Sequence, residues 1–241
     1  NSGKIWVGHY EGDLCYYPSA QSELVCMTDS LEEKVSIDGY LKYLYVDSNN
    51  ELWIGSVSSG LYRYNIGTKQ VRHYIQGDAS GDLTSNIVTA IQELSPGILA
   101  IGTDGGGLEI LHTDSETFEH YQHNPGNKNG ISSNAIHSVY IDNDKNLWLG
   151  TFREGLNLAS KNIEKFIAHS VRTDANDGLS QKSVLALLEV DNETLLIGTD
   201  GGGLNIYNRL HQSFLHLKHS QDNKKSIGGN VVKALFKDSK G

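Results

Sequence analysis

The sequence predicts an all-β fold of repeated four-stranded antiparallel units, and two observations carry this prediction. The first is a phrase that recurs five times in 241 residues: an apolar triplet, a glycine, a short polar stretch and a leucine. The anchoring glycines, spaced 47, 47, 48 and 48 residues apart, are Gly8, Gly55, Gly102, Gly150 and Gly198. A fixed period of this length means that one supersecondary unit is copied along the chain. The second observation is that each copy contains four strand-like stretches in a fixed order.

The four stretches differ in polarity as the strands of a blade should. The first is apolar throughout, which suits a strand buried on both faces, and it covers residues 87–91, 135–139, 183–187 and 231–235. A turn rich in Asp and Asn leads to the second stretch, which is the anchoring phrase itself. The third alternates from its leucine, and the fourth, as in residues 71–74, is the most polar. Four antiparallel strands per unit of this length, repeated radially, make a β-propeller.

The repeats run from end to end, so we expect a single array over residues 1–241 without a linker. Trp6, Trp53 and Trp148 are predicted to pack between neighbouring blades, whereas Ala100 and Leu196 stand at that position in the other two copies. Those two seams must be filled differently. The chain begins just before a second strand and stops just after a first one. Either the last strand pairs with the first and closes a five-bladed ring, or the five units are part of a larger ring.

Composition excludes several kinds of partner. The net charge of −9 repels a phosphate backbone, so we expect no nucleic-acid binding. No apolar run reaches the length of a membrane span and no signal peptide opens the chain, so we expect no membrane contact by this segment. We also expect no cofactor.

The two cysteines, Cys15 and Cys26, fall on consecutive predicted strands on either side of a turn near Pro18. A cross-strand disulfide needs the two Cα atoms within roughly 7 Å, which holds only if the residues lie opposite each other. Of the two alternatives, a disulfide or two separate thiols, we expect separate thiols.

The repeated phrase resembles the two-component regulator propeller repeat. The copies that carry the resemblance best are Ile101–Leu108 and Ile197–Leu204, which both read Ile-Gly-Thr-Asp-Gly-Gly-Gly-Leu, and the Ser-Asn stretches before the first strands agree with it. The resemblance implies that this chain is a piece of a longer bacterial membrane sensor, located in the periplasm, whose propellers usually have seven blades. It further implies a carbohydrate signal, a homodimer formed through the parent protein, and a histidine kinase or GGDEF-type cyclase as output.

Candidate ligand-binding residues fall in two places at the expected mouth of the propeller. One position of the first strand varies in kind while its neighbours stay apolar, and it is occupied by Lys42, Thr89, His137, Leu185 and Lys233. The turns between second and third strands vary as well, and they supply Tyr10, Asp104, Phe152, Arg153 and Asp200. An aromatic face stacks on a sugar ring and an arginine fork holds a carboxylate, which makes Phe152, Arg153 and Tyr10 the preferred candidates. The alternatives are a mixed channel wall and ordinary loop drift.

Other motifs do not lead to a catalytic or metal site. Residues 142–146 open like a calcium loop but lack its closing glutamate, so a plain hairpin turn is expected. His73, His120 and His216 share one outer-strand position on separate blades, too far apart to bind one metal ion. We therefore expect a non-catalytic sensor. The alternatives are a streptogramin-lyase type enzyme with His137 as general base, and a scaffold that binds other proteins.

Overall fold

The computed structural model describes residues 4–9, 13–19, 21–27, 37, 39–159, 165–171 and 178–238. Strands are the only regular elements of these residues, so the all-β prediction is confirmed. The strands are β1 (Ile5–Gly8), β2 (Leu14–Tyr17), β3 (Val25–Cys26), β4 (Leu41–Val46), β5 (Glu51–Ser56), β6 (Leu61–Asn65), β7 (Val71–Tyr74), β8 (Val88–Ser95), β9 (Ile98–Thr103), β10 (Gly107–His112), β11 (Thr117–Tyr121), β12 (Ile136–Ile141), β13 (Leu147–Thr151), β14 (Leu156–Ala159), β15 (Phe166–His169), β16 (Val184–Asp191), β17 (Thr194–Thr199), β18 (Leu204–Asn208) and β19 (Ser213–Leu217).

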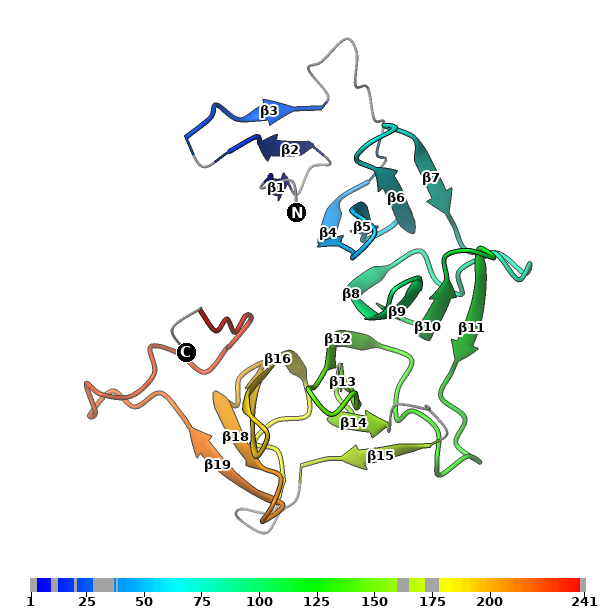
Figure 1. Cartoon of the computed structure of the whole chain (residues 1–241). Coiled ribbons are helices and arrows are strands. Elements are labelled where there is room, and N and C mark those ends of the chain that lie inside the picture. Colours follow the sequence, from blue (N-terminus) through cyan, green and yellow to red (C-terminus); the bar gives the residue numbers. More distant parts are fainter. Residues whose placement is uncertain are drawn as a thin grey trace. The chain divides into compact units, whose positions relative to one another are not determined.

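The strands form five antiparallel sheets, each a meander of strands that follow one another in the sequence (Figure 1). We call these sheets blades 1 to 5: β1–β3, β4–β7, β8–β11, β12–β15 and β16–β19. Blades 2 to 5 have four strands, as predicted for a β-propeller. Blade 1 has three, because β1 carries the anchoring Gly8 and therefore occupies the place of a second strand.

The chain folds into two compact units, residues 1–120 and 121–241. In the first unit, a core cluster joins blades 1 and 2 around Leu14, Leu52 and Ile54, and another joins blades 2 and 3 around Trp53. In the second unit, one cluster joins blades 4 and 5 around Trp148. Each of these cores is thus formed between two sheets, since a sheet must bury its apolar face against another element.

The anchoring glycines permit the blades to approach each other. A Cβ atom at Gly55 would lie 2.7 Å from Val88 Cγ1 of the next blade, and one at Gly150 would lie 2.6 Å from Val184 Cγ1. Both distances are shorter than real Cβ contacts, so a side chain at either position would push the neighbouring first strand away. The spacing of these two glycines therefore reflects a close approach between sheets, within the first unit at Gly55 and within the second at Gly150.

Two tryptophans fill the seams as predicted, and each is held by an aspartate. Trp53 and Trp148 are 0% and 2% exposed, and their indole N–H groups donate to Asp47 and Asp142 at 2.8 Å. The other oxygen of each carboxylate accepts backbone N–H groups of its own turn, as from Glu51 at 2.9 Å. The Asp142 carboxylate therefore accepts hydrogen bonds from its own turn and from an indole. This agrees with the prediction that residues 142–146 form a plain hairpin turn.

The distribution of burial corrects the expectation that the first strand is the most enclosed. All residues of β5 and β13 are buried, whereas β4 and β12 contain several partly exposed residues. The reason is position in the sheet: the first strand is an edge with one neighbouring strand, and the second strand lies between two. The predicted polarity of the fourth strand is confirmed, since three of the four residues of β7 are exposed.

The predicted first strand over residues 231–235 was wrong as a strand. Val231 makes only an isolated antiparallel bridge to Asp200. The segment still follows the second strand of blade 5, because Val232 N–H donates to the Thr199 carbonyl at 3.0 Å, and a Cβ at Gly198 would lie 2.6 Å from the Val232 carbonyl oxygen. The second-strand position Leu196, which lacks the tryptophan, borders a pocket of about 400 Å³ together with Phe236 and Lys237.

The expectation of separate thiols was also wrong. Cys15 and Cys26 lie directly opposite each other on β2 and β3 and form a disulfide, with Cα atoms 4.0 Å apart. Strand register decides this, because only directly opposed residues bring their Cβ atoms close enough.

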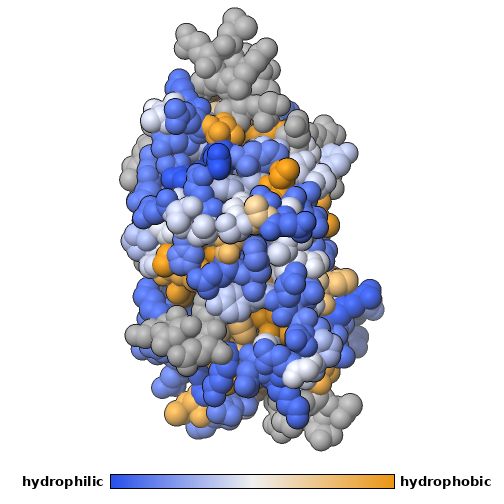
Figure 2. Space-filling model, turned by 90° about the vertical axis from the view of Figure 1, so that its right-hand side faces the viewer, coloured by the Kyte–Doolittle hydropathy of each residue, from blue (hydrophilic) through white to orange (hydrophobic). Residues whose placement is uncertain are grey.

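The surface in Figure 2 is mainly hydrophilic, with hydrophobic side chains in small separate groups. Among the residues that the structure describes, no helix has the length and apolar character needed to cross a membrane.

The seam tryptophan yields a stability prediction. Trp53→Ala should lower the free energy of unfolding by roughly 3–5 kcal/mol, because it opens a cavity between blades 2 and 3 and leaves Asp47 without its indole donor. Trp53→Phe should cost less, since it keeps most of the apolar contact. Urea unfolding measures both, with Ile75→Ala, which removes a half-exposed side chain, as the control. If Trp53→Ala lowered the free energy of unfolding no more than the control does, Trp53 would not be packed between blades 2 and 3.

A second prediction concerns pH. His169 lies against Trp148, Tyr207 and Phe214, and burial lowers the pKa of its imidazole from the ordinary value. Below about pH 6.5 the unfolded chain binds this proton more readily than the folded chain does. The free energy of unfolding therefore has its full value above that pH and decreases as the pH falls through it. His169→Phe should weaken this decrease, as measured by urea unfolding between pH 5 and 8, whereas exposed His211→Gln should not. Equal pH profiles for wild type and His169→Phe would refute the assignment.

Candidate functional site

The variable position of the first strand is a β-bulge in each of blades 2 to 5. The strand register shifts between Leu41 and Tyr43, and likewise between Val88 and Ala90, Ile136 and Ser138, and Val184 and Ala186. The residue that the register passes over in each shift is Lys42, Thr89, His137 or Leu185. A bulge re-aims the side chain of the extra residue and is common beside binding sites. The variation at this position thus has a structural cause, since a bulged residue departs from the regular alternation of the strand.

The bulged residues differ in how much of their surface is accessible to a ligand. Lys42 is exposed and His137 is partly exposed, whereas Thr89 is only 7% exposed. Lys233 is exposed and follows Val232 in the segment beside blade 5. Among these residues, Thr89 has the least surface with which to contact a ligand.

The structure brings three of the candidate residues together in blade 4. The imidazole of His137 stacks on the ring of Phe152, with centroids 5.1 Å apart and planes 19° from parallel. The Arg153 guanidinium carbon lies 4.7 Å from the centre of the same ring. Backbone geometry places these groups together, because the Phe152 N–H donates to the carbonyl of Ala135, just before β12, at 2.9 Å. We call His137, Phe152 and Arg153 the aromatic–arginine cluster.

The turn that carries this cluster is held in a costly conformation. Arg153 has φ of +74°, a left-handed value that favours glycine. Gly155 has φ of +84°, and a Cβ there would lie 2.2 Å from the His169 carbonyl oxygen, so the turn packs directly against β15. The hydroxyl of Thr151 donates to the Gly155 carbonyl at 2.8 Å and closes the turn. Arg153 is exposed, so its side chain is presented to solvent on a rigid turn.

The other turn candidates that the structure describes are Asp104 and Asp200. Asp104 and Asp200 are exposed, and each backbone N–H is held by a carbonyl at the start of its own blade, Ile87 at 2.9 Å and Ser183 at 3.0 Å. Lys42, Thr89 and Asp104 belong to the first compact unit, and His137, Phe152, Arg153, Asp200 and Lys233 to the second. Tyr10 lies outside the described residues. The ligand-binding role of all these residues stays a prediction.

Sequence reasoning missed a buried polar column on the third strands. Asn157 and Asn205 are 0% exposed, and each side-chain oxygen accepts the N–H of a serine that precedes the first strand, Ser132 at 3.0 Å and Ser180 at 2.8 Å. Glu109 takes this position in blade 3. Its carboxylate, also 0% exposed, accepts the N–H of Thr84 at 3.1 Å. The signal was the constant spacing of seven residues after the anchoring glycine.

The outer-strand histidines have separate partners. His120 bonds to the Glu109 carboxylate, His73 Nε2 lies 2.6 Å from the Ser59 carbonyl oxygen, and His216 Nε2 lies 2.9 Å from that of Gly178. In the part of the chain that the structure describes, no group of three or more His, Cys, Asp or Glu side chains could hold a metal ion.

Comparisons with known proteins agree with this architecture. Residues 130–153 match the family model described as "Two component regulator propeller", so the repeat that carries His137, Phe152 and Arg153 is of this kind. A search of curated proteins gave no match.

Solved structures share the fold. The extracellular domain of the putative hybrid two component system BT3049 from B. thetaiotaomicron is 22% identical with a TM-score of 0.77, over 99% of this chain and 30% of that one. The extracellular domain of the putative hybrid two component system BT4673 from the same organism is 18% identical with a TM-score of 0.66, over 100% and 35%. The computationally designed protein Ika8 is 15% identical with a TM-score of 0.61, over 99% and 64%. The chain thus spans about a third of the length of the two bacterial domains.

The left-handed turn yields a prediction that separates conformation from contact. Arg153→Gly and Arg153→Ala both delete the guanidinium, but only glycine adopts φ of +74° without steric cost. The glycine variant should therefore be more stable than the alanine variant by about 1 kcal/mol. Thermal unfolding of the two variants measures this difference. If alanine were as stable as glycine, residue 153 would not be held in the left-handed region.

Proposed function

We propose that this chain is a non-catalytic, ligand-binding part of the extracytoplasmic sensor region of a bacterial two-component signalling protein. The observation that carries the proposal is the family match over residues 130–153, because this stretch also holds the aromatic–arginine cluster. The similar bacterial structures support it, since their titles describe extracellular domains of putative hybrid two component systems. The parent protein would add a histidine kinase or a cyclase as output and would dimerise.

A location outside the cytoplasm, in the periplasm, is supported by the disulfide. Disulfides persist in oxidising compartments and are rare where thiols are kept reduced. Cys15 and Cys26 are the two cysteines of the sequence, and they form this disulfide.

The proposed ligand is a carbohydrate that contacts the aromatic–arginine cluster. A phenyl face packs on the C–H groups of a sugar ring, and a guanidinium donates several directed hydrogen bonds to hydroxyl or carboxylate oxygens. Phe152 and Arg153 supply these two groups within one turn. A ligand bound there would shift the conformational equilibrium of the parent protein only to the extent that it binds one arrangement of the sensor region more tightly than another.

The lyase alternative depends on His137 as a general base. The imidazole of His137 stacks on the ring of Phe152, and this arrangement supports a role for His137 in a binding surface instead. No feature of the described residues favours catalysis or a pure scaffold over ligand binding.

The test is a titration with a panel of neutral and acidic oligosaccharides. We expect at least one of them to raise the melting temperature, because a ligand that binds only the folded state stabilises it, and calorimetry should give a saturable affinity. Phe152→Ala should lower this affinity about tenfold or more, since an aromatic anchor commonly dominates a binding site. Arg153→Ala should have a smaller effect in the same direction.

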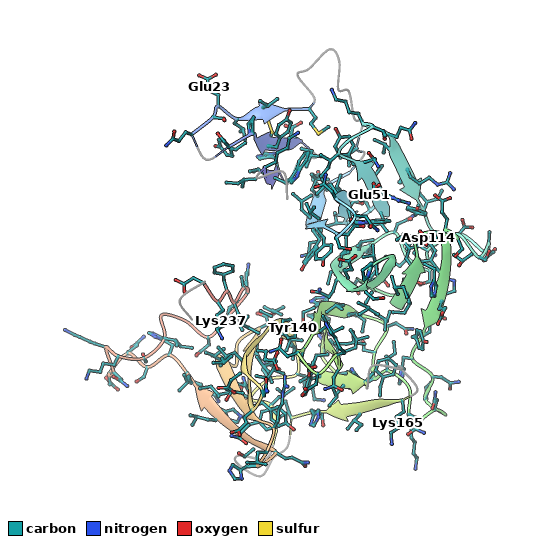
Figure 3. All side chains as sticks on the ribbon, viewed as in Figure 1. Glu23, Glu51, Asp114, Tyr140, Lys165 and Lys237 are labelled. Carbon is teal, nitrogen blue, oxygen red and sulfur yellow. A yellow bond between two sulfur atoms is a disulfide. The ribbon has the colours of Figure 1, made fainter. Side chains whose placement is uncertain are left out.

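Matched controls remove similar groups elsewhere in the second unit. Phe236→Ala deletes a phenyl that is 88% exposed, and Lys165→Ala deletes an exposed cation (Figure 3). Both should leave the affinity unchanged. The proposal fails if no oligosaccharide binds, if Phe152→Ala binds as wild type does, or if a substrate is turned over and His137→Ala stops the turnover.

A further inference from the structure

Residues 231–238 lie against blade 5 in the way that the first strand of one blade lies against the preceding blade. A Cβ atom at the anchoring Gly198 would lie 2.8 Å from Val232 Cγ1, and the first-strand valines of blades 3 and 5 come equally close to the preceding glycines. Lys237, labelled in Figure 3, donates to the carbonyl oxygen of Val190 at 2.6 Å. These two contacts define how the segment is placed along blade 5.

The contact of Lys237 is also the one expected of a first strand. Lys237 stands five residues after Val232, as Glu93 stands five residues after Val88. Glu93 bonds to the turn of blade 2 through Ser48, and Lys237 likewise bonds to the end of β16. The segment thus has the position of a first strand. Among the residues that the structure describes, however, it joins a strand ladder only through an isolated bridge.

The kind of residue opposite the second strand depends on whether that strand carries a tryptophan. The pairs observed in blades 2 to 5 are Tyr45–Trp53, Gln92–Ala100, Tyr140–Trp148 and Leu188–Leu196. A tyrosine therefore stands opposite each tryptophan, and a non-aromatic residue stands where the tryptophan is missing. Phe236 takes this position in the segment, and its side chain is 88% exposed.

An aspartate two residues further along follows the same rule. Asp47 and Asp142 accept the indole N–H of the tryptophan in their own blade at 2.8 Å. Blades 3 and 5, which lack the tryptophan, have an apolar residue at this position. Asp238 takes the position in the segment. Phe236 and Asp238 therefore both match a second strand that carries a tryptophan.

We infer that residues 231–238 are the docking site for β1 of a second copy of this chain. β1 has the sequence of a second strand with Trp6 at the tryptophan position, and it is an edge strand of its sheet. In the register of blades 2 and 4, Phe236 lies opposite Trp6, and the indole N–H donates to Asp238. The new antiparallel ladder pairs the backbone groups of two strand edges.

The apolar side chains of β1 support this docking. Ile5 and Val7 are 51% and 38% exposed, whereas the equivalent residues of blade 2, Leu52 and Ile54, are buried in the core shared with blade 1. Docking turns Ile5 and Val7 toward the pocket of about 400 Å³ that side chains of blade 5 line beside the segment. Apolar surface of both copies leaves water, which drives the association.

Sedimentation equilibrium and NMR of the protein test the inference. We expect reversible self-association, in which the indole N–H signal of Trp6 shifts with protein concentration and those of Trp53 and Trp148 do not. Phe236→Ala should weaken the association about tenfold or more, because an aromatic anchor is lost. Asp238→Leu should weaken it several-fold, since the indole N–H would be buried without an acceptor.

A mixture of two variants identifies the two sides of the interface. Ile5→Lys places a charge on β1 at a half-exposed position, so the fold of blade 1 is retained, and its segment 231–238 is unchanged. Phe236→Ala alters the segment and leaves β1 unchanged. Each variant alone should associate weakly, whereas the mixture should form a heterodimer, because each protein supplies the side that the other has lost.

The matched control is Leu210→Ala, which removes another exposed apolar side chain of the second unit and should leave the association unchanged. The inference is overturned if Phe236→Ala associates as wild type does or if the mixture forms no heterodimer. It is also overturned if the protein is monomeric at every concentration, as it would be if the segment paired with β1 of the same chain. Any of these results would leave the proposed carbohydrate binding intact, because that is measured at Phe152 and Arg153.

Discussion

The close contact between the second strand of one blade and the first strand of the next is the constraint on which this structure depends. At Gly55 and Gly150 the neighbouring valine comes so near that a single added carbon would collide with it. This contact sets the distance between sheets, and the tryptophans then fill the space beside it. A single sheet of three or four strands cannot bury an apolar face by itself, so the stability of each blade comes largely from packing against its neighbour.

Polar groups are built into these seams in a way that leaves few buried atoms unpaired. Asp47 and Asp142 each bind a turn and an indole, and Glu93 and Glu189 bind the turn of the preceding blade through Ser48 and Asn143. Such pairing is needed because an unpaired buried carboxylate costs more than the bond itself contributes. The buried carboxylate oxygens without a hydrogen bond among the described residues, Glu51 Oε2 and Glu189 Oε1, each lie within 3.3 Å of an arginine nitrogen.

The candidate ligand-binding surface arises from departures from regular strand geometry. The bulges at Lys42, Thr89, His137 and Leu185 occur at the same point of each first strand, so the repeat supplies the backbone and leaves the side chain to vary. Arg153 adds a left-handed residue in the facing turn. A strained residue in a rigid turn is maintained only when the surrounding contacts determine it, here by the packing of Gly155 on β15.

The sequence by itself determined the all-β class, the number of repeats, the strand order within a blade and the packing of the tryptophans, because periodic spacing records which residues must face one another. It also indicated the variable column and the Phe152–Arg153 turn. Only the tertiary structure decided that this column is a bulge, that His137 stacks on Phe152, and that Cys15 pairs with Cys26, since each depends on strand register. Residues 231–235 show most clearly where prediction from the sequence pattern ends. Their apolar pattern favours a strand, but ladder hydrogen bonds form only where a partner strand lies alongside.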